Sequence, residues 1–325
     1  ILKHRGPNSF GKINFEEWSF FHNRLSIVDL NDRANQPYIY QNLICLYNGE
    51  IYNFNEIKQK LIKFGYTFDT KSDTEVVVKA FNYWKKDCLS IFNGMFSITI
   101  FDKITGNLTI MRDRFGIKPI YYSLMGKYIF FGSELKSLFA LGVKKEINKK
   151  SVANYIENGQ YCHDESTFYK NIYEILPGNY IEFKNGKLKK TQWYVLPIKQ
   201  KKVSFSDAIN EFNRLLESSI KLRLFADVPV SLSLSGGLDS SSIFYRVFDY
   251  GLSDNVDKVY HWTSKSENDE SRYAQNIVDK YGETLVTSIF YKSDFFKYID
   301  KTLMNVEQPF GGLNTATSLK TFENM

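Results

Sequence analysis

The segment Ser235-Gly236-Gly237-Leu238-Asp239-Ser240-Ser241 carries the residue types of an anion-binding turn. Apolar residues alternate with smaller ones over 228–234 and return at helical spacing afterwards, which predicts a strand, a tight turn and a helix start. The two glycines leave backbone N–H groups open at the helix N-terminus, where partial positive charge attracts anions. The serine hydroxyls add donors, but Asp239 would repel a phosphate unless a cation such as Mg²⁺ lay between them. The pattern therefore predicts a site for magnesium and a polyphosphate.

Other phosphate and nucleophile motifs are excluded at this turn. It lacks the lysine of G-x-x-x-x-G-K-[ST], and it matches neither G-x-G-x-x-G nor G-x-S-x-G. A turn of small residues that only joins a strand to a helix is the alternative for S-G-G alone. The strand before the turn and the Asp-Ser-Ser after it favour the phosphate site.

The turn also resembles the pyrophosphatase-type P-loop (PP-loop) of ATP-dependent adenylating amidotransferases. The resemblance implies that Asp239 holds Mg²⁺ and that ATP phosphate oxygens are bound by Ser235, Gly236, Gly237, Ser240 and Ser241. It further implies that adenosine is bordered by the backbone near Leu234 and by the end of the next strand at Thr263.

Five strings in the first half of the chain occur in the order and spacing of one family. They are His4-Arg5-Gly6-Pro7, Arg24-Leu25-Ser26-Ile27-Val28-Asp29, Asn48-Gly49-Glu50-Ile51-Tyr52-Asn53, Ser72-Asp73-Thr74-Glu75 and the string R-D-R-F-G-I-K-P at 112–119. They resemble the glutaminase domain of class II glutamine amidotransferases, in the form found in glutamine-hydrolysing asparagine synthetases. Ser133-Glu134-Leu135-Lys136 and Leu176-Pro177-Gly178 match the same family, so the resemblance covers essentially the whole chain.

The resemblance implies how glutamine is held. Arg24 would bind the glutamine carboxylate with its forked guanidinium, and Asp73 would bind the α-ammonium. Asn48 and Gly49 would form the oxyanion hole, and Glu50 would position the substrate. Arg24 and Asn48-Gly49 have plain structural alternatives, because an arginine after a strand is commonly a surface ion pair and Asn-Gly is commonly a turn. The string at 112–119 is interpreted as structural, with Gly116 and Pro119 shaping the entry to the next strand.

The resemblance also implies a nucleophile that this chain does not show. It would be a cysteine at the N-terminus of the mature chain, with its own α-amino group as base. Residue 1 is Ile, so we expect a fragment that lacks this cysteine and the acceptor-binding part of the synthetase domain, and that has no glutaminase activity alone. Cys45, Cys88 and Cys162 are interpreted as packing residues.

The elements that must position these residues differ between the two halves. Strands are expected at 18–29 and 42–53, helices at 54–64 and 73–86, and hairpins at 95–113 and 120–132. From 203 onward, a helix capped by Ser204 precedes the turn, and strands at 257–264 and 284–290 alternate with helices at 268–281 and 294–303. This alternation predicts a parallel, doubly wound sheet that binds ligands at the carboxyl ends of its strands.

The predicted architecture therefore has two domains. The resemblance implies that residues 1–195 are an α+β, Ntn-type glutaminase with antiparallel sheets between helices. It implies that residues 203–325 are an α/β, parallel-sheet PP-loop ATP pyrophosphatase domain, and 191–202 contain the linker.

Composition narrows the class of protein. The chain has 325 residues, 43% of them hydrophobic, and a net charge of +6 from scattered lysines that lack the aromatic interleaving of a nucleic-acid surface. No apolar run approaches a membrane span and no signal peptide is apparent, so we expect a cytoplasmic protein that binds neither nucleic acid nor membrane. The cysteines and histidines show no metal-ligand spacing.

The function that the resemblance implies is the ATP-dependent amidation of aspartate to asparagine through β-aspartyl-AMP, with ammonia supplied by glutamine. Glutamine, aspartate and ATP are the expected substrates, and Mg²⁺ is the expected ion. A homodimer is the oligomeric state that we consider. One alternative is a related amidotransferase that acts on another carboxylate, of a sugar or a secondary metabolite. The other is a non-catalytic ATP-binding relative.

Overall fold

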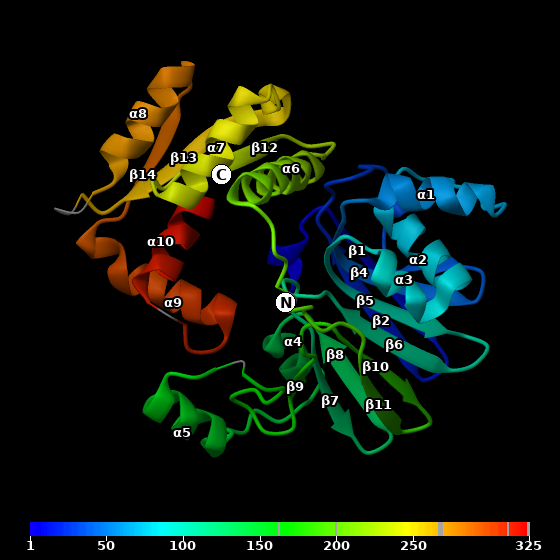
Figure 1. The fold of residues 1–325 in the computed structure, drawn as a ribbon. Coiled ribbons are helices and arrows are strands. Elements are labelled where there is room, and N and C mark those ends of the chain that lie inside the picture. Colours follow the sequence, from blue (N-terminus) through cyan, green and yellow to red (C-terminus); the bar gives the residue numbers. More distant parts are fainter. Residues whose placement is uncertain (162, 199, 266–268, 311, 324–325) are drawn as a thin grey trace. The chain divides into compact units, whose positions relative to one another are not determined.

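The structure is a computed structural model that describes residues 1–161, 163–198, 200–265, 269–310 and 312–323 (Figure 1). The chain divides into two compact units, Ile1–Lys199 and Gln200–Met325. Among the described residues, no helix is long and apolar enough to cross a membrane.

The first unit is built around a six-stranded sheet in which every pairing is antiparallel. Its strands, in spatial order, are β11 (Lys187–Gln192), β10 (Asn179–Lys184), β6 (Asn107–Arg112), β5 (Gly94–Asp102), β4 (Leu43–Ile51) and β3 (Tyr38–Tyr40). The prediction of locally paired, antiparallel strands in this half is confirmed.

The two faces of this sheet carry separate cores, because successive side chains of a strand point to opposite faces. Cys45 and Tyr47 of β4 pack with α1 (Phe54–Lys63) and α2 (Asp73–Trp84), whereas Ile44 and Leu46 belong to the other core. Figure 1 shows α1 and α2 together on one side of the sheet, with the short α3 (Cys88–Ile91) beside them.

Two smaller sheets contribute to the second core. One is the hairpin of β1 (Ser9–Phe15) and β2 (Trp18–Arg24), and the other joins β8 (Tyr128–Gly132), β7 (Tyr121–Met125) and β9 (Tyr173–Glu174). Phe20 from β2 and Tyr122 from β7 are buried there against the large sheet. The remaining helical elements of the unit are η1 (Lys3–Arg5), η2 (Asp32–Ala34), η3 (Lys85–Asp87), α4 (Leu135–Ala140) and α5 (Lys149–Asn158).

The strand predicted at 18–29 ends earlier, at Arg24. The Arg24 side chain hydrogen-bonds to the backbone carbonyls of Val28, Asp29 and Asn31, which requires the chain to turn back around it. Asp29 has a positive φ of 54°, a conformation that no strand accommodates.

The second unit contains three parallel strands in chain order, β12 (Val230–Ser233), β13 (Val256–Thr263) and β14 (Leu285–Ile289). The parallel sheet is therefore confirmed, and no reversal of strand order occurs among these described strands. Its helical elements are α6 (Phe205–Arg223), α7 (Leu238–Asp249), η4 (Ser253–Asn255), α8 (Ser271–Tyr281), η5 (Lys292–Asp294), α9 (Phe295–Val306) and α10 (Leu313–Phe322).

Local signals set the helix starts of this unit. The Ser204 hydroxyl accepts a hydrogen bond from the Asp207 backbone N–H at 3.1 Å, as the capping signal predicted. The helix predicted at 268–281 begins at Ser271, and residue 268 lies outside the described residues. Leu234, Phe244 and Val259 form part of the core between α7, α8 and the sheet.

Candidate functional site

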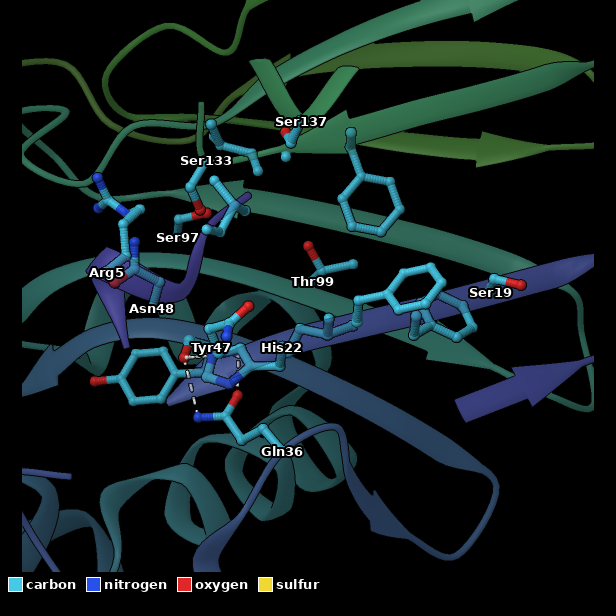
Figure 2. Close-up of a pocket in the computed structure, with 18 of the residues that line it drawn as sticks. Arg5, Ser19, His22, Gln36, Tyr47, Asn48, Ser97, Thr99, Ser133 and Ser137 are labelled. Atoms are coloured by element: carbon cyan, nitrogen blue, oxygen red, sulfur yellow. Dashed lines mark hydrogen bonds between the residues drawn. The ribbon is translucent and has the colours of Figure 1, made fainter. Parts of the chain in front are cut away.

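A cavity of about 1460 Å³ opens in the first unit. Its walls come from β2, β4, β5 and β8, and the first residues of the chain also line it. All five residues predicted to act on glutamine lie on these walls, namely Arg24, Asn48, Gly49, Glu50 and Asp73. They come from three separate strings of the sequence, so the structure brings the predicted residues together. Figure 2 shows Asn48 among the residues that line the cavity.

Asn48 and Gly49 lie on β4 opposite Ser97 and Phe96 of β5. The Asn48 Nδ2 atom is buried and has no hydrogen-bond partner among the described residues. A buried amide without an acceptor is costly, so this group is suited to an oxygen that enters the cavity. Gly49 has a φ of 156°, and a Cβ there would come within 2.1 Å of the Met95 carbonyl oxygen, so only glycine fits.

Asp73 is the first residue of α2 and is buried. Its Oδ2 accepts hydrogen bonds from the Tyr47 hydroxyl at 2.7 Å and from the Ile51 backbone N–H at 3.1 Å. Burial raises the pKa of Asp73 in spite of these bonds. The carboxylate is therefore held in place, and a cation in the cavity would stabilise its ionised form.

Glu50 lines the same cavity two residues after the oxyanion candidate Asn48. Burial raises the pKa of Glu50 to about 8, and the nearby charge of Asp73 adds to this effect, while Lys118 opposes it. Two carboxylates that share one site repel each other's ionised form. The pair is thus prepared for a positively charged ligand.

Arg24 is buried at the end of β2, and its terminal nitrogens are already occupied. Nη1 donates to the Asn31 carbonyl at 3.0 Å and to Asn35 Oδ1 at 3.1 Å, and Nη2 donates to the carbonyls of Val28 and Asp29. Arg24 therefore holds the turn at 28–35. Binding a carboxylate through its fork would require that turn to release it.

His22 is a cavity residue that the sequence prediction missed. Its Nε2 lies 3.1 Å from the Tyr47 carbonyl, which can only accept, so Nε2 carries the proton and Nδ1 is an acceptor. Nδ1 is buried with no partner among the described residues, and burial lowers the pKa of His22 to about 4. The available signal was its spacing of two from Arg24, which puts both on one strand face.

The rim of the cavity joins two strings that are far apart in the sequence. The Glu134 carboxylate is paired with His4 Nε2 at 2.9 Å, with Arg5 Nη1 at 3.0 Å and with Lys136 Nζ at 2.8 Å. These pairings fix η1 against the start of α4.

The string at 112–119 is folded around the buried carboxylate of Asp113. That carboxylate accepts hydrogen bonds at 3.0–3.1 Å from the backbone N–H groups of Phe96, Phe115, Ile117 and Lys118. Gly116 has a φ of +67° within this loop. The loop is structural, as interpreted, but it also places the Lys118 side chain on the cavity wall, which was not anticipated.

In the second unit, the predicted phosphate turn lies between β12 and α7, with Gly237 as the N-cap of the helix. The turn is closed by contacts between Ser235 Oγ and Ser240 Oγ at 2.9 Å and between the Gly237 N–H and Ser235 Oγ at 3.1 Å. Gly236 has a φ of +90°, and a Cβ there would lie 2.9 Å from the Glu270 carbonyl oxygen. The Ser241 hydroxyl is buried without a partner among the described residues.

Asp239 lies exposed in the first turn of α7. The described residues contain no cluster of three or more His, Cys, Asp or Glu that could hold a metal ion. Mg²⁺ commonly takes one or two protein carboxylates together with phosphate oxygens and waters, so a single exposed Asp beside an anion-binding turn fits it.

The two residues predicted to border adenosine lie at the carboxyl ends of neighbouring strands. The Leu234 N–H donates to the Tyr260 carbonyl at 2.8 Å, and the Leu234 carbonyl lies 2.8 Å from His261 Nδ1. Thr263 ends β13, and its hydroxyl oxygen accepts from the Lys265 N–H at 2.9 Å. His261, which the sequence prediction missed, thus fixes the backbone that leads into the turn.

Comparison with known proteins agrees with the two kinds of site. Residues 1–194 match the family described as "Glutamine amidotransferase domain". The chain belongs to the glutamine amidotransferase family. Residues 211–322 match the family described as "Asparagine synthase", and the resemblance to glutamine-hydrolysing asparagine synthetases is thereby confirmed.

Individual relatives of this amidotransferase are similar over most of its length. "Putative asparagine synthetase [glutamine-hydrolyzing] 2" of Methanocaldococcus jannaschii is 33% identical over 99% of this chain and 66% of its own. "Asparagine synthetase [glutamine-hydrolyzing] 1" of Bacillus subtilis is 33% identical over 75% of this chain and 39% of its own. "Amidase chyE" of Penicillium rubens is 30% identical over 77% of this chain and 37% of its own. The chain spans less than two thirds of each of these relatives.

Proposed function

We propose that the protein containing this chain is a glutamine-hydrolysing asparagine synthetase. The first unit, of the Ntn type, would release ammonia from glutamine, and the second, a PP-loop domain, would use MgATP to adenylate the β-carboxylate of aspartate. Attack of ammonia on β-aspartyl-AMP would give asparagine and AMP. The observation that carries the proposal is the gathering of the five predicted glutamine residues on the walls of one cavity.

The first step of the proposed reaction uses the charges and donors of this cavity. Asp73 and Glu50 would receive the α-ammonium of glutamine, and Arg24 would receive its carboxylate after the turn at 28–35 releases the guanidinium. The unpartnered Asn48 amide and the Gly49 N–H stabilise the negative oxygen of the tetrahedral intermediate, where such donors have their largest effect. The nucleophile of the family is an N-terminal cysteine, and Ile1 and Leu2 line the cavity.

The second step uses the turn after β12. The N–H groups and hydroxyls of Ser235, Gly236, Gly237, Ser240 and Ser241 bind phosphate oxygens, and Asp239 holds Mg²⁺. When bound, the ion would neutralise charge on the pyrophosphate group of ATP. The strand ends at Leu234 and Thr263 border the nucleoside. The unpartnered Ser241 hydroxyl and the positive φ of Gly236, which glycine adopts without strain, support this assignment.

Two assays on the complete protein test the proposal. Purified enzyme should release glutamate from glutamine, and ATP–pyrophosphate exchange should depend on L-aspartate and Mg²⁺. Absence of glutamate release from a chain that carries the upstream cysteine would contradict the glutaminase assignment. Absence of exchange with every carboxylic acid tested would instead favour a non-catalytic ATP-binding relative.

A second acceptor class is favoured by one comparison. "Amidase chyE" and "Amidase chry2" are 30% and 31% identical to this chain over 77% and 75% of its length. Amidation of a carboxylate other than aspartate is therefore the second candidate. Exchange driven by a different carboxylic acid, with aspartate inactive, would establish it.

A further inference from the structure

His261 connects the strand end that leads into the phosphate turn with the start of α8. It lies on β13 and is 3% exposed. Its Nδ1 lies 2.8 Å from the Leu234 carbonyl, which can only accept, so Nδ1 donates. Its Nε2 lies 2.9 Å from the Oγ of Ser271, the first residue of α8. One imidazole ring therefore fixes Leu234 and Ser271 at a defined separation.

The phosphate turn packs against the same end of α8. Gly236 has a φ of +90°, and a Cβ there would lie 2.9 Å from the Glu270 carbonyl oxygen and 3.2 Å from the Ala274 nitrogen. Glu270 is the N-cap of α8 and immediately precedes Ser271. The position of Ser271 relative to Leu234 therefore determines whether Gly236 fits against this helix.

Ser271 is held from its other side by Asp269. The Asp269 Oδ1 atom accepts hydrogen bonds from the Ser271 N–H at 2.9 Å and from the Ser271 hydroxyl. These bonds, the hydroxyl bond most strongly, lower the pKa of Asp269, so the acceptor is an ionised carboxylate at neutral pH. A continuous series of contacts thus runs from Leu234 through His261 and Ser271 to Asp269.

We propose that His261 is a positioning residue for ATP, which holds the phosphate turn at its place beside α8 through Leu234 and Ser271. This proposal rests on the proposed ATP-binding function of the second unit. The N–H groups of Gly236 and Gly237 can bind phosphate oxygens only if the turn holds them in place. A turn that must first be ordered binds its ligand more weakly, because the ordering costs conformational entropy. His261 removes this cost without touching the nucleotide.

The direct test measures MgATP binding to the full-length protein by calorimetry. His261→Phe keeps a ring of similar size and removes both nitrogens, and we expect it to weaken binding about tenfold. Ser271→Ala should weaken binding by a smaller factor, because Leu234 keeps its bond to His261. Ser271→Thr retains the hydroxyl and should bind as the wild type does. Wild-type affinity in His261→Phe would overturn the proposal.

The matched control is His163→Phe, which changes an exposed histidine of the first unit and should leave MgATP affinity unchanged. Urea denaturation of each variant separates positioning from stability alone. A lower free energy of unfolding with unchanged MgATP affinity would show a purely structural role and overturn the proposal. If His261→Phe does not fold, Ser271→Ala and Ser271→Thr decide, and equal affinities in these two variants would overturn the proposal.

A double variant tests whether His261 and Ser271 act through one another. If they do, His261→Phe combined with Ser271→Ala should bind MgATP no more weakly than His261→Phe alone. Losses that multiply in the double variant would contradict a shared series of contacts.

Kinetics of ATP–pyrophosphate exchange give a further readout. In His261→Phe, KM for MgATP should rise about tenfold, while kcat at saturating MgATP and KM for the acceptor acid change little. An equal loss in kcat with an unchanged KM for MgATP would contradict the proposal. A wild type that binds no MgATP would overturn the proposed function together with this inference. A wild type that binds MgATP, beside an unaffected His261→Phe, would overturn this inference alone.

Discussion

The hydrogen bonding of single cavity residues depends on their neighbours at the large sheet. The Asn48 amide has no acceptor among the described residues, and the His22 Nδ1 atom has no donor, although both atoms are buried. Unmatched groups of this kind destabilise the empty site and favour a ligand that completes them. The cavity therefore favours a polar ligand.

Asn48→Ala removes the side-chain donor of the proposed oxyanion hole. We expect kcat for glutamate release by the full-length protein to fall about 10²–10³-fold, with a smaller change in KM. The matched control is Asn14→Ala, which changes an exposed asparagine on β1 and should leave kcat unchanged. A loss in the control as large as in Asn48→Ala would contradict the assignment.

Glu50→Gln tests how much the neighbouring carboxylates of Glu50 and Asp73 lower the free energy of unfolding. In the folded protein the pKa of Glu50 is raised from 4.5 to about 8, so the folded state binds more protons than the unfolded state between these values. The free energy of unfolding should therefore fall as pH rises through this window. Glu50→Gln should lack this decline and be more stable than wild type by about 4 kcal/mol at pH 8. Urea denaturation at pH 5 and pH 8 measures the difference, and equal stability of both proteins at pH 8 would contradict it.

At the scale of elements, both sites depend on short connections that follow strands. The turn after β12 has its conformation because Gly236 adopts a φ of +90° and approaches the carbonyl of Glu270 before α8. The loop after β6 has its conformation because Asp113 collects four backbone N–H groups. Each connection is fixed by backbone geometry more than by side-chain packing.

Gly236→Ala tests the turn. The new Cβ would meet the Glu270 carbonyl oxygen at 2.9 Å in a backbone conformation that alanine disfavours, so the turn must shift. MgATP binding by the full-length protein, measured by calorimetry, should weaken at least about tenfold, which corresponds to about 1.4 kcal/mol. Gly251→Ala is the control, since it has a φ of +62° with nothing within 4 Å, and its strain should leave ATP affinity unchanged.

Many of the helices, strands and turns that carry the two sites could be predicted from the sequence. The strand, turn and helix around Ser235–Ser241 and the capping of α6 by Ser204 follow from local periodicity and local hydrogen bonds, and both are present. The end of β2 could not be predicted, because Arg24 turns the chain through contacts with residues 28–35. The placement of His22 and Lys118 on the cavity wall depends on which strands become neighbours, and local patterns along the sequence do not indicate that pairing.

At the scale of the whole molecule, residues 193–198 and 200–204 form no helix or strand between the two units. Several side chains there are exposed, and Ile198 is 91% exposed. The cytoplasmic location and the homodimer stay predictions.

Limited proteolysis tests this division into units. Trypsin should cut the folded chain first after Lys201 or Lys202, which are exposed, and leave two resistant fragments that mass spectrometry identifies. Lys79, which is buried in α2 and paired with Glu75, should resist cleavage until unfolding. First cuts after Lys79 in α2 or after the buried Arg112 of β6 would contradict the assignment of a stable first unit.

Tyr47 connects several elements around the cavity through its hydrogen bonds. Its backbone N–H and carbonyl are bonded to Gln36, its carbonyl also accepts from His22, and its hydroxyl donates to Asp73. One residue thus joins β2, β4 and α2 directly, and its neighbour in the chain is Asn48. Asp73, which would bind the α-ammonium of glutamine, and Asn48, which would bind its reacting oxygen, are therefore held in one fixed arrangement. Little conformational entropy is then lost when glutamine is aligned.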